Sequence, residues 1–198
     1  GYEAARLASN ALIGGMPGAQ LRFEAGPAAK GIVATQFLGI DNYTVDRTRL
    51  LNGGRFMNRL FVPTVRYGAD AALTGVVQIA SMPRHLVWTH TVKGKTNAAK
   101  TARISLGGAA LAGYQTVKWL VPGRAVRLTN GKGLGWLFVV ADDKQHGLSI
   151  NAKGAVVAER TVKSIPSAGL SVSLLVAPAH ALSEQELALY LNPTEQVQ

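Results

Sequence analysis

Histidine and arginine side chains at the start of one strand-like run are the first candidates for chemistry. Residues 85–93 alternate between polar and apolar side chains, a pattern that predicts a β-strand with two distinct faces. His90 shares the apolar face with Trp88, which favours a hydrogen-bonded core histidine. His85 lies on the polar face beside Arg84, so it is a candidate for a catalytic or ligand-binding role, with an ordinary surface histidine as the alternative.

A second group of candidates lies in the polar segment from Asp41 to Arg59, which mixes arginine with aspartate, tyrosine and asparagine. Arginine can grip a carboxylate or sulfate with two parallel hydrogen bonds, and long polar connections between strands often carry function. An internal Asp–Arg network that pins the segment to the fold is the alternative. The candidate ligand-binding residues are Arg47, Arg55, Arg84 and His85.

Metal binding has one candidate cluster. Asp142, Asp143 and His146 fall in a single loop, where carboxylate and imidazole groups could hold a cation. Their spacing matches no metal-binding motif, so an ordinary polar turn is the alternative. The chain has no cysteine, which excludes disulfides, thiolate metal sites and cysteine catalysis. Serine-nucleophile, phosphate-loop and zinc-protease motifs are also absent, and no cofactor is expected.

The tryptophans are candidates for sugar stacking, because the C–H face of a pyranose is apolar and packs on exposed aromatic rings. Trp88 and Trp119 lie on the apolar faces of their predicted strands, and Trp136 lies in a run that is apolar on both faces. Core packing is therefore the favoured interpretation for all three.

Many short strand-like runs separated by glycine, proline and asparagine turns must position these residues. Pro63 predicts an edge or a bulge within its strand, Pro122-Gly123 a type II turn, and Asn151–Gly154 a hairpin turn. The predicted strands are residues 21–24, 31–40, 56–67, 73–80, 85–93, 102–106, 114–121, 124–129, 134–141, 148–150, 155–161 and 170–177. This pattern predicts an all-β fold, a two-sheet antiparallel β-sandwich of the super-sandwich or jelly-roll-like kind.

Short helices are expected at both ends of the chain. Residues 3–13 form a possible first helix, and Ser183 with Glu186 forms a capping box that begins a second helix ending near Leu191. We expect a single domain over residues 1–198: an N-terminal segment 1–20, a sandwich 21–179, and a C-terminal helix and linker 180–198. The chain begins at Gly1 rather than methionine, so a piece of a longer protein with further domains or subunits is expected.

The charge balance favours an anionic partner. Lys and Arg number 21 against 11 Asp and Glu, a formal net charge of +10, which favours acidic polysaccharide, nucleic acid or another polyanion over a neutral ligand. A solvated basic surface is the alternative. No apolar run approaches the roughly 20 residues of a membrane span, so none is expected.

Three features together resemble the galactose-mutarotase-like β-super-sandwich domains of glycoside hydrolases and polysaccharide lyases. They are Asp41–Arg47 before a strand with a mid-strand proline, Met82–His85 leading into a tryptophan-bearing strand, and the closing run Gly169–Pro178. The resemblance covers residues 31–178 and carries over no catalytic residue. It implies a polysaccharide partner, and with it an extracellular or periplasmic location in a bacterium.

Three functions are therefore open. The first is an accessory or carbohydrate-binding β-sandwich that favours an acidic polysaccharide. The second is a capsid-like jelly-roll subunit whose basic surface contacts nucleic acid, although neither end of the chain concentrates Lys or Arg. The third is a polysaccharide lyase, in which Arg84 or Arg55 would neutralise a uronate carboxylate and His85 or Tyr43 would remove the C5 proton.

Overall fold

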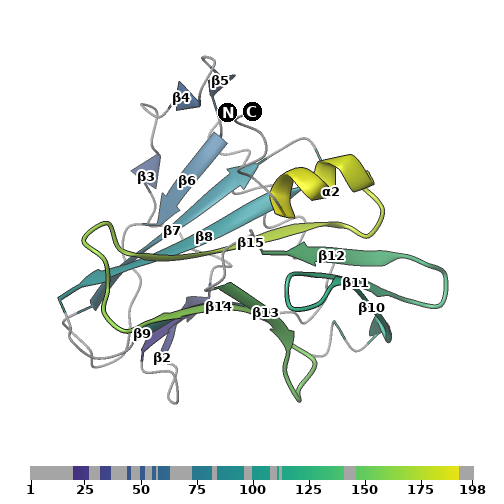
Figure 1. The fold of residues 1–198 in the computed structure, drawn as a ribbon, viewed down its shortest axis with the longest axis horizontal. Helices are drawn as coiled ribbons and strands as arrows, with labels where there is room; N and C mark the ends of the chain where they lie inside the picture. The colour runs from purple at the N-terminus through teal and green to yellow at the C-terminus, as the bar shows by residue number, and fades with distance from the viewer. Residues whose placement is uncertain are drawn as a thin grey trace.

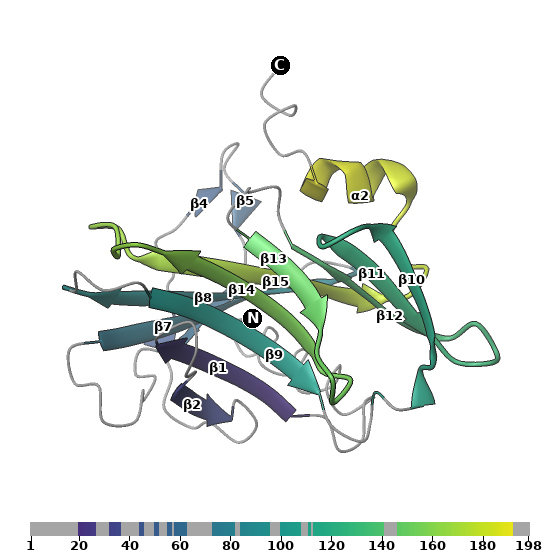
Figure 2. The same cartoon turned by 60° about the horizontal axis from the view of Figure 1, so that its bottom comes forward.

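The computed structural model stacks two antiparallel β-sheets and places helix α2 (Glu184–Leu191) beside the larger one (Figures 1 and 2). The predicted all-β two-sheet sandwich is confirmed. The structure describes residues 20–26, 32–36, 44–45, 50–51, 55–56, 58–62, 73–81, 84–95, 100–107, 111, 113–140 and 146–191. For residues 20, 26, 32–62, 74, 76–81 and 146, side chains are not described.

The strands in the described part of the chain are β1 (Gln20–Gly26), β2 (Ile32–Gln36), β3 (Thr44–Val45), β4 (Leu50–Leu51), β5 (Arg55–Phe56), β6 (Asn58–Val62), β7 (Leu73–Ser81), β8 (Leu86–Gly94), β9 (Lys100–Gly107), β10 (Thr116–Val121), β11 (Ala125–Thr129), β12 (Gly135–Val139), β13 (His146–Ile150), β14 (Val156–Val162) and β15 (Leu170–Pro178). One sheet has eight strands in the order β10-β11-β12-β15-β8-β7-β6-β3. The other has five in the order β13-β14-β9-β1-β2, and β4 pairs with β5.

The main core fills the space between the two sheets. Side chains alternate along β8 as the sequence predicts, so that Leu86, Trp88, His90 and Val92 are buried. They meet the buried faces of β1 and β9, which the sequence places on every second residue. Burial of this apolar surface is the main force that holds the sheets together.

A second, smaller core lies on the outer face of the eight-stranded sheet, under α2 (Figure 1). Leu137 and Leu175 face outward and pack with Leu182 and Leu191, which explains why β12 is apolar on both faces. The predicted capping box begins the helix: Ser183 Oγ accepts the Glu186 N–H at 3.1 Å, and the Ser183 N–H donates to Glu186 Oε1 at 3.3 Å. Within the described residues no helix is long and apolar enough to cross a membrane.

Turn chemistry shapes the C-terminal half. The type II turn at Pro122-Gly123 is confirmed, with a φ of +72° at Gly123 and a bond from Arg124 N to Val121 O at 3.0 Å. Two further hairpin turns share the pattern Asn-x-Lys-Gly. We call them the first turn (residues 130–134, between β11 and β12) and the second turn (residues 151–155, between β13 and β14).

One sequence expectation needs correction. The segment 41–59 was expected to be a polar connection, but it contains β3, which pairs with β6, and the hairpin of β4 and β5. The apolar pair Leu50–Leu51 is followed by Asn52-Gly53-Gly54, a sequence typical of a hairpin turn. The possible helix 3–13 and Pro63 lie outside the described residues.

Candidate functional site

The predicted site residues Arg84 and His85 face helix α2. The Arg84 guanidinium donates to the Glu186 carboxylate at 2.5 Å, and His85 Nε2 is hydrogen-bonded to the Tyr190 hydroxyl. The rings of His85 and Tyr190 meet edge to face, with centroids 5.0 Å apart. The structure therefore gives both predicted site residues partners within the chain.

The electrostatics of this cluster match a neutral histidine beside an ion pair. Burial lowers the pKa of His85, the neighbouring Arg84 lowers it further, and Glu186 opposes both effects. Burial also raises the pKa of Tyr190, whereas the Ser183 backbone N–H lowers the pKa of Glu186. These contacts hold α2 against the start of β8, and an Arg84 that neutralised a substrate carboxylate would first have to leave Glu186.

The other predicted site residues cannot be placed as a cluster. Tyr43, Arg47, Asp142 and Asp143 lie outside the described residues. Arg55 begins β5 and His146 begins β13, and their side chains are not described. Within the described part of the chain, no group of three His, Asp or Glu side chains is arranged to hold a metal ion.

His90 is the core histidine that the sequence predicts. It is fully buried and its Nδ1–H donates to the Arg103 carbonyl at 3.1 Å, while its ring meets Phe23 at an interplanar angle of 67°. Burial lowers its pKa to about 4. Trp88 is fully buried too, and Trp119 is partly buried against the same core.

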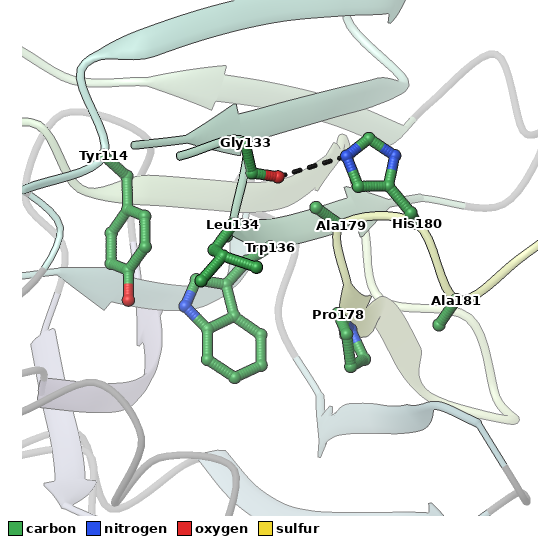
Figure 3. Close-up of a pocket in the computed structure, with 9 residues that line it drawn as sticks. Tyr114, Gly133, Leu134, Trp136, Pro178, Ala179, His180 and Ala181 are labelled. Carbon is green, nitrogen blue, oxygen red and sulfur yellow. Dashed lines mark hydrogen bonds between the residues drawn. The ribbon is translucent and has the colours of Figure 1, made fainter. Parts of the chain in front are cut away.

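Trp136 lies instead at the wall of an open pocket of about 340 Å³ (Figure 3), which we call the aromatic pocket. Tyr114 lies on one side of the indole and Pro178 on the other, and Leu134 lies beside them with 62% of its surface exposed. His180 completes one rim. The lining residues are Tyr114, Gly133, Leu134, Gly135, Trp136, Pro178, Ala179, His180 and Ala181.

Hydrogen bonds from β11 and β12 to Ala179, which directly follows β15, build this pocket. The Ala179 N–H donates to the Gly135 carbonyl at 2.9 Å, and the Arg127 Nε–H donates to the Ala179 carbonyl at 2.8 Å. A Cβ at Gly135 would lie only 1.8 Å from the Leu128 carbonyl oxygen, so the strand pairing requires glycine there. These contacts fix the chain segments on which Trp136 and the rim residues stand.

Few polar groups interrupt the apolar wall. The indole N–H of Trp136 is buried and has no hydrogen-bond partner, and in Figure 3 its nitrogen lies on the side toward Tyr114. The His180 Nε2–H donates to the Gly133 carbonyl at 3.2 Å and ties the rim to the first turn. An apolar, aromatic wall with a small number of polar groups is typical of binding pockets for organic ligands.

Sequence reasoning missed this pocket. It assigned Trp136 to the core, and the structure does pack that side chain partly against the core, but the same ring also lines the pocket. The turn residues from Asn130 to Leu134 could have indicated that Trp136 lies near the surface, because a strand that follows a hairpin turn begins at the open end of a sandwich. The pairing that brings Pro178 opposite Trp136 joins residues far apart in the chain, which local patterns do not reveal.

Comparison with known proteins adds no relative: no family model matches this sequence, and no curated protein matches it significantly.

Proposed function

We propose that this chain is a carbohydrate-binding, accessory β-sandwich domain that holds a polysaccharide at the aromatic pocket. The observation that carries the proposal is the open wall made by Tyr114, Leu134 and Trp136. Apolar C–H faces of sugar rings pack on such side chains, and partly exposed aromatic rings supply large contact area with little loss of conformational freedom.

The charges favour an acidic polysaccharide. None of the lining residues is acidic in the described structure, and Lys132 is in the first turn beside Gly133. The whole chain carries a formal charge of +10, which raises the local concentration of a polyanion and speeds its association. The resemblance of the sequence to super-sandwich domains implies the same partner. An extracellular or periplasmic location is part of the proposal.

Binding is better supported than β-elimination. An eliminating enzyme needs a cation for the uronate carboxylate and a base beside it. The candidates Arg84 and His85 are engaged by Glu186 and Tyr190, and neither lines the aromatic pocket. Tyr114 and His180 are described residues of that pocket that could act as a base, but its described lining includes no lysine or arginine that would neutralise a uronate carboxylate beside them.

Affinity electrophoresis tests the proposal directly. The chain is run through gels that contain alginate, polygalacturonate, hyaluronan or neutral xylan, and a bound polysaccharide slows its migration. We expect retardation by at least one acidic polysaccharide that persists above about 0.3 M salt, where surface charge is strongly screened. Migration unchanged by every polysaccharide would remove the proposal. Equal retention by single-stranded RNA would also remove it, if a small addition of salt abolished the retention by RNA and by polysaccharide alike.

Matched variants locate the site. Tyr114→Ala and Trp136→Phe are expected to weaken binding about tenfold or more, because central aromatic anchors dominate such contacts. Trp119→Phe is the control, since this side chain is also partly buried against the core but does not line the pocket. Circular dichroism confirms that each variant is folded, and equal affinities of all three variants would place the polysaccharide elsewhere.

A further inference from the structure

A second pocket lies on the outer face of the five-stranded sheet. It is lined by residues from the start of β1, the end of β9 and the second turn, and Figure 2 shows these chain segments close together. Register places Arg22 opposite Ser105 and Glu24 opposite Arg103, so these side chains share the face turned away from the core. Arg22, Glu24 and Ser105 line a space of about 340 Å³ together with Asn151 and Lys153 of the second turn, and we call this space the polar pocket.

Arg22 is half-buried at this pocket, and its Nε–H is buried without a hydrogen-bond partner. Among the described residues no ion pair includes Arg22. Leaving a donor of a charged group unsatisfied and out of water costs free energy, and a guanidinium offers five donors in a fixed fork. Arg22 lines the pocket, so an anion bound there would lie beside this guanidinium.

The acidic neighbour of Arg22 is directed elsewhere. Glu24 lies 3.6 Å from Arg103, whose Nε–H also donates to Glu159 at 2.8 Å. Glu24 and Arg103 are both largely buried, with 15% and 16% of their side chains exposed. Arg22 and Lys153 therefore remain as two cations at the pocket without an ion-pair partner among the described residues. Of the lining residues that the structure describes, Glu24 alone is acidic.

We propose that the polar pocket binds the oxyanion of a sugar acid, a uronate carboxylate or a sugar sulfate ester. Arg22 would grip two of its oxygens through parallel N–H donors, and Lys153 would add a second positive charge. The Ser105 hydroxyl is a further donor. The site extends the proposed function to the acidic substituents of a polysaccharide, but it uses different residues and a different sheet from the aromatic pocket.

The test is an NMR titration of the ¹⁵N-labelled chain with sodium glucuronate at constant ionic strength. We expect saturable shifts of the Arg22 Nε–H signal and of the Ser105 and Lys153 amides. Arg22→Gln should weaken this binding about tenfold or more, as expected for loss of charge-assisted hydrogen bonds. Its thermal stability should be unchanged or higher, because the variant removes a half-buried unpaired charge.

The first and second turns provide a matched control. Lys153→Gln and Lys132→Gln make the same charge change at the same position of two equivalent turns, but only Lys153 lines the polar pocket. We expect a several-fold loss of glucuronate affinity for the first variant and none for the second. Equal effects of the two, or wild-type affinity in Arg22→Gln, would overturn the proposal in favour of a diffuse basic surface.

Further probes define the ligand. Inorganic sulfate that binds the same residues more tightly than glucuronate would assign the pocket to sulfate esters, and weaker sulfate binding would assign it to uronates. A short oligouridylate that displaces glucuronate with higher affinity and the same Arg22 dependence would overturn the sugar assignment in favour of nucleic acid. Glucuronate binding that survives Trp136→Phe would show that the two pockets act independently, so that either proposal can fail alone.

Discussion

The first and second turns have the same backbone but different surroundings. In each turn the backbone N–H of the asparagine donates to the carbonyl of the fifth residue, and the asparagine carbonyl accepts the N–H of the glycine. The asparagine side-chain oxygen accepts two further backbone N–H groups at 2.9 to 3.1 Å. The glycines have similar positive φ values, +75° at Gly133 and +80° at Gly154. Both turns therefore combine a type I turn with a left-handed glycine.

Their neighbours differ. The first turn enters β12 of the eight-stranded sheet and adjoins Trp136 and the apolar wall, whereas the second enters β14 of the five-stranded sheet and adjoins Arg22. After the first turn comes Gly135, and after the second comes Val156, which is fully buried. Local turn chemistry thus sets the hairpin, and the strands beside it decide whether the end of the sandwich is aromatic or charged.

The largest effect is expected from a change that acts on both regions together. His90 lies in the shared core, and burial lowers its pKa from 6.5 to about 4. The unfolded chain therefore binds a proton near pH 6.5 and the folded chain only near pH 4. The stability that neutral His90 gives to the folded chain is fully present above pH 6.5 and is lost as the pH falls to about 4. Over this range the free energy of unfolding should decrease by about 3 kcal/mol.

Urea unfolding of the wild type and of His90→Gln across this pH range measures the effect. The variant should be less stable at neutral pH, because it loses a buried hydrogen bond, but its stability should fall less steeply with acid. Both pockets should lose their ligands together in the wild type as the shared core unfolds. Parallel pH profiles for the two chains would show that His90 is not the titrating group.

Substitution of Gly135 tests why the strand after the first turn begins with a glycine. An added Cβ would meet the Leu128 carbonyl oxygen at 1.8 Å, so Gly135→Ala must push β11 and β12 apart. We expect a loss of about 2 kcal/mol in the free energy of unfolding, together with weaker binding at the aromatic pocket. Gly131→Ala is the control, since a Cβ there meets nothing within 4 Å. Similar stabilities of the two variants would mean that the strands adjust easily.

The same contrast shows what the sequence predicts and what it does not. Alternation along β8 correctly predicts which face is buried and that His90 is hydrogen-bonded, and Pro122-Gly123 correctly predicts its turn. These features depend on neighbours in the chain. The aromatic pocket depends on the pairing of Trp136 with Pro178, and the polar pocket on Arg22 meeting the second turn, about 130 residues away. No local pattern encodes such meetings, so both pockets required the structure.

Replacing the positive-φ glycine should destabilise the fold equally in the two turns. Alanine has open space at both glycines but must adopt a left-handed conformation. Gly133→Ala and Gly154→Ala are each expected to lower the free energy of unfolding by about 1 kcal/mol. Thermal unfolding of both variants measures it. A difference between them clearly greater than the error would show that the surroundings, and not the turn, set the strain.

The smallest effect concerns the fifth residue of each turn, which is Leu134 in the first and Ala155 in the second. Leu134 is 62% exposed, so Leu134→Ala should change the free energy of unfolding by no more than about 0.5 kcal/mol. The same variant should weaken polysaccharide binding two- to threefold, roughly, because it removes part of the apolar wall. Glucuronate binding at the polar pocket should be unaffected. Full polysaccharide affinity in this variant would show that the ligand contacts only the aromatic rings of the pocket. A large loss of stability would show that the Leu134 side chain packs inside the fold and is not a surface contact for a ligand.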